Sequence, residues 1–259
     1  MNTGLKEMEY SSQWCRQATE LIARIHGSQA SQIEQAATAV AASIECGHAT
    51  FLFGSGHSVI PVEEMYPRYG GLLGFIPMIE LPLSFFTPIV GNMGFSQFDY
   101  LENNAEYGRK IMDSYVVHRE DSLITFSHSG STPVTLEAAM SFKDRGGKVI
   151  GVTSLSRSSG SVSKHPSGMA LHNVADIIID TCVPDGDVSV DVNGNMIGPL
   201  SSVGAVTVAN LISIESVNQL IKGGIEPVVN PVRAFDPDAS GKMASILTRY
   251  RRLYAEHIS

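Results

Sequence analysis

The stretch from Phe126 to Pro133 joins an apolar run to a helix-like pattern through a loop of small polar residues. Residues 121–126 predict a short buried strand, and residues 133–143 predict a helix. Thr132 fits the N-cap of that helix and Pro133 its first position, where a missing N–H costs nothing. A strand that passes directly into a helix is the unit of layered α/β folds, so this stretch constrains the fold class strongly.

The same loop is a predicted phosphate-binding site. Its hydroxyl groups, the free N–H groups of the first helical turn and the positive end of the helix dipole converge, and Gly130 lets the backbone approach an anion closely. A simpler interpretation is helix capping alone, but a cap needs one hydroxyl and this loop has four. The predicted phosphate-binding residues are Ser127, His128, Ser129, Gly130, Ser131 and Thr132.

A second loop of this type follows residues 49–53, which predict another buried strand. Its sequence is Gly54-Ser55-Gly56-His57-Ser58. Ile60 stands where the dinucleotide fingerprint needs a third glycine, and no Gly-x-x-x-x-Gly-Lys-Ser/Thr string occurs, so we expect no nucleotide cofactor. The loop is instead predicted to wrap a sugar or its phosphate, through Gly54, Ser55, Gly56 and Ser58.

Further apolar runs alternate with helical patterns, which is typical of a doubly wound parallel sheet of about five strands with helices on both faces. In such sheets, ligands bind at the carboxyl ends of the strands, where both loops are expected. Residues 188–197 give a strong hairpin signal with Asn193-Gly194 at the turn. We predict an N-terminal helical extension at residues 1–27, one α/β domain at 28–225 and a C-terminal extension with a helix at 226–259.

The charge of the chain argues against several classes of partner. The formal net charge is −8, and the clustered cations that nucleic acid or an anionic membrane would require are absent. An anionic substrate must therefore be captured locally, by hydroxyls and helix ends. The three cysteines show no Cys-x-x-Cys spacing and are expected to be free thiols. With no signal-peptide pattern and no long apolar run, a cytoplasmic protein is expected.

The two loops, in this order and at the ends of predicted strands, resemble the sugar isomerase (SIS) domain family. Residues 127–132 are similar to the Ser-x-Ser-Gly-x-Thr loop that holds the phosphosugar phosphate in this family. The resemblance covers roughly residues 28–225 and looks closest to an uncharacterised subfamily usually described as phosphoheptose isomerases. It implies an SIS-type fold, a phosphosugar ligand and a homo-oligomer, either a dimer or a tetramer, with an apolar helix at residues 200–220 in the dimer core. The alternative is that this helix is buried within one subunit.

An aldose–ketose isomerase moves a proton between adjacent carbons, which requires a positioned carboxylate and a proton carrier. Glu63 and Glu64 fall on the predicted helix after the first loop, and one of them is expected to face the sugar because helix neighbours do not share a face. Histidines in the predicted loops are candidates for the acid, because imidazole titrates near neutral pH. The predicted catalytic residues are Glu64, Glu63, His57 and His165.

The chain departs from the family that it resembles at two positions. The phosphoheptose isomerases carry a metal-binding histidine at the position of Glu64, and their catalytic glutamate falls opposite Arg68. This departure puts both their metal and their base in question for this chain. Because His-Glu-x-x-His spacing is also absent, we expect no metal.

Three functions fit these residues. The first is an isomerase or epimerase of a phosphorylated sugar, with Glu64 as the base and His165 or His57 as the acid. The second is a lyase or deglycase acting on an amino-sugar or sugar-amine phosphate with the same acid–base groups. The third is a non-catalytic phosphosugar sensor, which is disfavoured because the segment before residue 28 is too short for a DNA-binding helical domain and carries no basic patch. Fold analogy does not choose between the first two.

Overall fold

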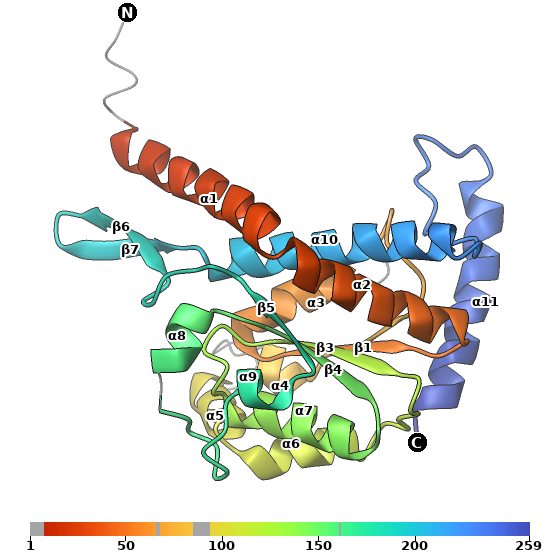
Figure 1. The fold of residues 1–259 in the computed structure, drawn as a ribbon, viewed down its shortest axis with the longest axis horizontal. Coiled ribbons are helices and arrows are strands. Elements are labelled where there is room, and N and C mark those ends of the chain that lie inside the picture. The colour runs from red at the N-terminus through yellow and green to blue at the C-terminus, as the bar shows by residue number, and fades with distance from the viewer. Residues whose placement is uncertain (1–7, 66–67, 85–93, 161) are drawn as a thin grey trace, which may run out of the picture.

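Within the residues that the structure describes, the central sheet has five parallel strands, as predicted from the sequence. The computed structural model describes residues 8–65, 68–84, 94–160 and 162–259. The strands lie in the order β2-β1-β3-β4-β5, and every neighbouring pair is parallel (Figure 1). They are β1 Thr50–Gly54, β2 Phe75–Met78, β3 Ser122–Phe126, β4 Lys148–Thr153 and β5 Ile177–Asp180.

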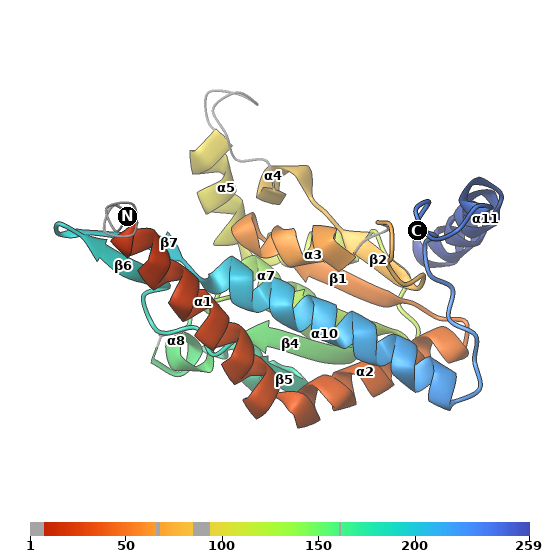
Figure 2. The ribbon, with the colours of Figure 1, turned by 90° about the horizontal axis from the view of Figure 1, so that it is seen from above.

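Helices cover both faces of the sheet (Figures 1 and 2). One face packs against α1 Glu9–Ser28, α2 Ala30–Glu45, α3 Ile60–Met65 and α10 Ser201–Lys222. The other packs against α5 Gly94–Glu102, α6 Ala105–Met112, α7 Pro133–Asp144 and α9 Leu171–Val174. The 3₁₀ turn η1 Gly56–Val59 follows β1, and the shorter or peripheral helices are α4 Leu81–Ser84, α8 Leu155–Gly160 and α11 Ala239–His257.

Alternation of side chains along the strands produces the two layers. Leu52 and Ile124 point into the core under α2 and α10, whereas their neighbours Phe51 and Leu123 point into the core under α6 and α7. Every residue of β1 and β3 is buried. A strand that is buried on both faces is mostly apolar, which explains why both strands were visible in the sequence as nearly continuous apolar runs.

The order of the strands reverses between β1 and β3. From β1 the chain crosses to β2 on one side, and β3, β4 and β5 continue on the other side. Gly54 and Phe126, the last residues of β1 and β3, are partners in the strand register. The two loops that follow them therefore start side by side, at the switch point where open α/β sheets bind ligands.

The predicted hairpin is present as β6 Val188–Val192 and β7 Asn195–Pro199. Asn193 and Gly194 have φ angles of 53° and 85°, as a type I′ turn requires. The chain then enters α10, which packs against α2 and α3. The hairpin and α11 stand at opposite ends of the molecule (Figures 1 and 2).

The helix α10 is only partly buried within this chain. Ile214 and Ile221 on its outer side are 61% and 60% exposed. Burial within one subunit therefore accounts for one side of α10, and coverage of the other side by a second subunit stays a prediction, as do the predicted domain boundaries. No described helix is both long and apolar enough to cross a membrane.

The close packing of α6 on α7 depends on Gly108. A Cβ atom added there would lie 2.4 Å from the backbone oxygen of Val134, nearer than Cβ atoms approach. We expect Gly108→Ala to lower the free energy of unfolding by about 1–3 kcal/mol, because overpacking outweighs the better helix propensity of alanine. Gly27→Ala in α1 is the matched control, since nothing lies within 4 Å of its added Cβ atom. Urea denaturation measures both, and equal stabilities would contradict the prediction.

Candidate functional site

The first loop, residues 54–58, folds back over the end of β1. A Cβ atom on Gly54 would lie 2.1 Å from the backbone oxygen of Ser58. Gly56 has a φ of 58°, and a Cβ atom there would lie 3.0 Å from the ring of Phe98. The Ser55 hydroxyl donates a long hydrogen bond, at 3.5 Å, to the carboxylate of Glu102 at the end of α5. The glycines are thus required by close approach of the chain to itself and its neighbours.

The second loop, residues 127–132, is held in a tight turn by its own hydroxyls. The Ser127 hydroxyl accepts a hydrogen bond from Gly130 N–H at 3.2 Å, and the Ser129 hydroxyl accepts one from Ser131 N–H at 3.3 Å. Gly130 has a φ of 62°, and a Cβ atom there would lie 2.6 Å from the Ser158 hydroxyl. This loop therefore cannot accommodate a side chain at Gly130 without moving.

Thr132 and Pro133 occupy the N-cap and first positions of α7, as predicted. No side chain among the described residues accepts a hydrogen bond from the first-turn N–H groups of this helix. The hydroxyls of the second loop do not cap α7, so capping alone does not account for them. Pro133 has no N–H and the Leu136 N–H donates to the Thr132 carbonyl, so the N–H groups of Val134 and Thr135 are left for another acceptor.

A cavity of about 130 Å³ lies between the two loops and the start of α10. His57 and Ser58 line it from the first loop, and Ser127 and His128 line it from the second. The structure thus brings together four of the predicted site residues. The others in these loops do not form its wall: Gly54, Ser55, Gly56, Ser129, Gly130, Ser131 and Thr132.

His128 lies on the cavity wall, in surroundings that favour its neutral form. Burial lowers the pKa of His128 below its usual value, the Asp187 and Asp185 carboxylates oppose that shift, and Arg157 adds to it. The Nδ1 atom of His128 is buried without a hydrogen-bond partner among the described residues. A neutral imidazole can accept a proton at its unprotonated ring nitrogen.

Asp187 is a cavity residue that the sequence analysis missed. Its carboxylate accepts hydrogen bonds from the N–H of Leu200 at 2.9 Å, and from the N–H and hydroxyl of Ser201 at 2.6 and 2.8 Å. It therefore caps α10 and takes the place that an anion would occupy at that helix start. The sequence held no signal for this role, because Asp187 reaches α10 from the other side of the β6–β7 hairpin.

The two predicted carboxylates lie outside the cavity wall. Glu63 is exposed, and Glu64 forms an ion pair with Arg68 and accepts a hydrogen bond from the Asn210 amide at 3.3 Å. A metal in the position that the phosphoheptose isomerases use does not fit here, because the carboxylate of Glu64 is already held by a cation and an amide. The roles of Glu63 and Glu64 stay predictions. The group of described residues that could hold a metal lies at the other end of the sheet.

His165 belongs to a buried network on the opposite face of the sheet. Its Nδ1 atom accepts the Ser167 N–H at 3.1 Å, so the ring proton is on Nε2 and is donated to Glu137 at 2.9 Å. Arg109 of α6 donates to the other oxygen of Glu137 at 2.9 Å. The three side chains border an open groove and not the cavity between the two loops.

Glu137 and Arg109 were also missed in the sequence. The available signal was a glutamate inside the otherwise small and apolar stretch of residues 134–140, since a buried charge requires a partner. Burial by itself raises the pKa of Glu137, but hydrogen bonds from Arg109 and His165 outweigh it, so the pKa is lowered.

This network should make stability depend on pH. The folded-state pKa of Glu137 lies below its unfolded value. The contribution of Glu137 to the free energy of unfolding is therefore fully present above the unfolded pKa, and it is lost as pH falls through the folded pKa. We expect Glu137→Gln to lower the free energy of unfolding by about 2 kcal/mol at neutral pH, and the difference from wild type to shrink in acid. Glu106→Gln is the control, because Glu106 also pairs with Arg109 but its side chain is 64% exposed. Urea titrations at several pH values test this, and a pH-independent difference would count against it.

Comparisons with known proteins agree with this architecture. A family model described as SIS domain matches residues 13–154, more than half of the chain. The UPF0309 protein of Thermoanaerobacter pseudethanolicus is 33% identical over 214 residues, which cover 80% of this chain and 84% of that protein.

Two solved structures share the fold. A phosphoheptose isomerase from Francisella tularensis has a TM-score of 0.52 and 18% identity, over 81% of this chain and 98% of that chain. A phosphoheptose isomerase from Neisseria gonorrhoeae has a TM-score of 0.53 and 13% identity, over 83% and 98%. The chain therefore belongs to the SIS-domain family and, within it, to the UPF0309 proteins.

Proposed function

We propose that this chain binds a sugar phosphate between the first and second loops and interconverts its aldose and ketose forms, or epimerises it. One observation carries the proposal: the register of β1 with β3 sets both loops beside one cavity, with His57 and His128 on its wall. Its place at the switch point of the sheet supports a ligand site. Membership of the SIS-domain family supports a phosphosugar as the ligand.

The second loop supports phosphate binding through backbone N–H groups. The tight turn at Gly130 leads into α7, whose first turn has no side-chain cap among the described residues. Those N–H groups and the helix dipole favour an anion. Since the net charge of the chain is −8, local groups of this kind must hold the phosphate against the overall field.

The cavity can hold only part of the proposed ligand. Its volume of about 130 Å³ is smaller than the roughly 300–1,000 Å³ that is usual for small-molecule sites. The ligand must therefore extend beyond the cavity, toward residues 129–132 and the start of α7, which do not line it. A second subunit packed on the exposed side of α10 would enclose the open part of the site, and light scattering on the purified chain would detect the oligomer.

The chemistry requires a base that removes the proton next to the carbonyl, and a group that moves protons between the sugar oxygens through an enediol. His128 suits proton transfer because its lowered pKa favours the neutral ring, and His57 lines the same cavity. Glu64 is the proposed carboxylate base, and it reaches the substrate only if its ion pair with Arg68 opens.

One observation favours a second function, a phosphosugar sensor without catalysis. The carboxylate on the described wall of the cavity belongs to Asp187, and it is committed to three hydrogen bonds at the start of α10. A protein that only binds the ligand needs no free base. Measurement of proton exchange separates this function from the isomerase.

Binding should appear as thermal stabilisation by pentose, hexose or heptose monophosphates and not by the free sugars. A ligand at 100 times its Kd adds about 2.7 kcal/mol to the free energy of unfolding. We expect Gly130→Ala to abolish the shift, because the added Cβ atom would lie 2.6 Å from the Ser158 hydroxyl. Gly224→Ala is the matched control: it has a similar positive φ of 77°, but nothing lies within 4 Å.

If none of these phosphates stabilises the wild type, the proposed ligand class is wrong. An equal shift in Gly130→Ala and Gly224→Ala would place the phosphate outside the second loop. Melting curves without ligand show whether either variant has lost its fold.

Catalysis should appear as exchange with solvent deuterium at the carbon next to the carbonyl, followed by NMR in heavy water. We expect His128→Gln and Glu64→Gln each to slow exchange about 100-fold or more if they transfer protons. Glu34→Gln, an exposed glutamate of α2, is the control and should exchange at the wild-type rate. Binding without exchange in the wild type would reject the isomerase and support the sensor.

A further inference from the structure

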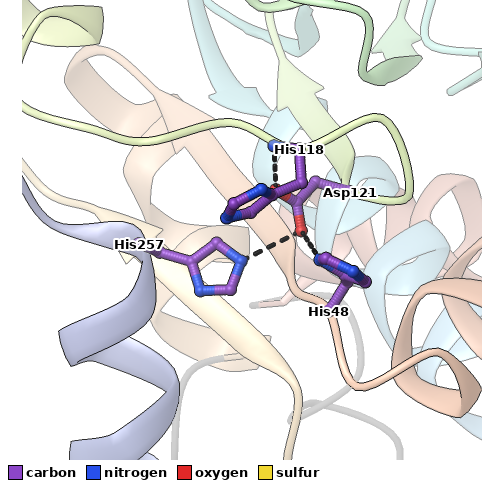
Figure 3. A group of neighbouring side chains, drawn as sticks. All are labelled: His48, His118, Asp121 and His257. Atoms are coloured by element: carbon purple, nitrogen blue, oxygen red, sulfur yellow. Dashed lines mark hydrogen bonds and ion pairs between the residues drawn. The ribbon is translucent and has the colours of Figure 1, made fainter.

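Three histidines and an aspartate converge at the amino end of the sheet, away from both loops (Figure 3). His48 lies in the segment that enters β1, His118 and Asp121 lie in the segment that enters β3, and His257 ends α11. One potential ligand atom from each lies within 4.8 Å of all the others. Asp121 and His257 are buried, while His48 and His118 are partly exposed.

The distances suit a bound ion. The Asp121 Oδ1 atom lies 3.1 Å from His257 Nε2 and 3.5 Å from His48 Nδ1. Two ligands that are each about 2.0–2.1 Å from a tetrahedral Zn²⁺ ion lie about 3.3–3.4 Å apart. Small rotations of the partly exposed His48 and His118 rings would close the wider separations in the group.

The outer contact of His257 fixes the orientation of its ring. His257 Nδ1 lies 2.8 Å from the Leu253 carbonyl, which can only accept, so this nitrogen carries a proton. Nε2 lies 3.1 Å from Asp121 Oδ1, a separation that either a shared proton or a bound metal ion accounts for. A hydrogen bond from a metal-ligating histidine to a backbone carbonyl is the usual way in which proteins orient the ring.

His48 approaches the same carboxylate from the other side. Its Nδ1 atom lies 3.5 Å from Asp121 Oδ1, and its Nε2 atom lies 3.7 Å from a carboxylate oxygen of Glu120, beyond hydrogen-bond distance. The Nδ1 atom is buried and has no hydrogen-bond partner among the described residues. Asp121 itself is fixed by the backbone N–H groups of Ala49 and His118, at 2.9 and 2.6 Å.

We propose that this group, His48, His118, Asp121 and His257, binds a transition-metal ion of the Zn²⁺ type. Imidazole nitrogens favour Zn²⁺ over Mg²⁺ and Ca²⁺, which prefer oxygen ligands. Four protein ligands complete a tetrahedral shell, so the site is structural and holds no open position for substrate. A cavity of about 350 Å³ with His48 on its wall gives the ion a path from solvent.

The ion would fasten the C-terminal helix to the sheet. His257 is the last residue of α11, and its carbonyl already accepts the Val116 N–H at 2.9 Å. A metal shared with His48 and Asp121 ties α11 to the segments that enter β1 and β3. Removal of the ion should therefore loosen α11 while the two loops at the opposite edge keep their positions.

The test uses the full chain after chelation and dialysis, with Zn²⁺, Co²⁺ and Mg²⁺ as probes. We expect one Zn²⁺ per chain by elemental analysis, a higher melting temperature with Zn²⁺ but not with Mg²⁺, and the intense visible absorption of tetrahedral Co²⁺. His118→Asn and His48→Asn, both at partly exposed positions, should weaken Zn²⁺ binding about 100-fold or more. His26→Asn, on the exposed side of α1, is the matched control and should bind as the wild type does.

Two results would overturn the proposal. The first is a wild-type chain that takes up no stoichiometric Zn²⁺, which would mean that a proton alone joins His257 to Asp121. The second is unchanged Zn²⁺ binding in His118→Asn and His48→Asn with loss in His128→Gln, which would move the metal to the cavity between the loops. Neither result depends on phosphosugar binding, so the proposed function and this site can fail separately.

Discussion

The parallel pairing of β1 with β3 sets the geometry at both edges of the sheet. At the carboxyl edge, the register partners Gly54 and Phe126 end their strands side by side. The two loops begin there, and His57 and His128 line one cavity. At the amino edge, the same pairing brings His48 next to Asp121. A shift of one residue in this register would separate both pairs, because successive side chains of a strand point to opposite faces.

The two edges use different chemistry. The carboxyl edge offers hydroxyls, backbone N–H groups and an uncapped helix start, which suit a phosphate in a chain with a net charge of −8. The amino edge offers imidazoles around one buried carboxylate, which suit a soft divalent cation. Between them lies a core that is buried on both faces of β1 and β3 and contains no site of its own. Changes at one edge can therefore be tested without disturbing the other.

The sequence was most informative for structural features that are set by residues close together in the chain. The sheet, the hairpin, the N-cap at Thr132 and the two loops all follow from short patterns, and the structure contains each of them. Contacts between distant segments were not visible. Asp187 caps α10 from across the hairpin, and Glu137 meets His165 only through tertiary packing. Spacing rules do not reveal the histidine group either, because its members come from three separate places in the chain.

The contact between Asp187 and α10 also makes the electrostatics of the cavity depend on the hairpin. The φ of 65° at Asp187 and its three hydrogen bonds hold the start of β6 against the helix that carries Ser201. If the hairpin swung outward, a negative charge would leave the cavity and a second helix dipole would be exposed in the same movement. The affinity of the cavity for anions therefore depends on the position of the β6–β7 hairpin, although the hairpin contributes little else to the cavity wall.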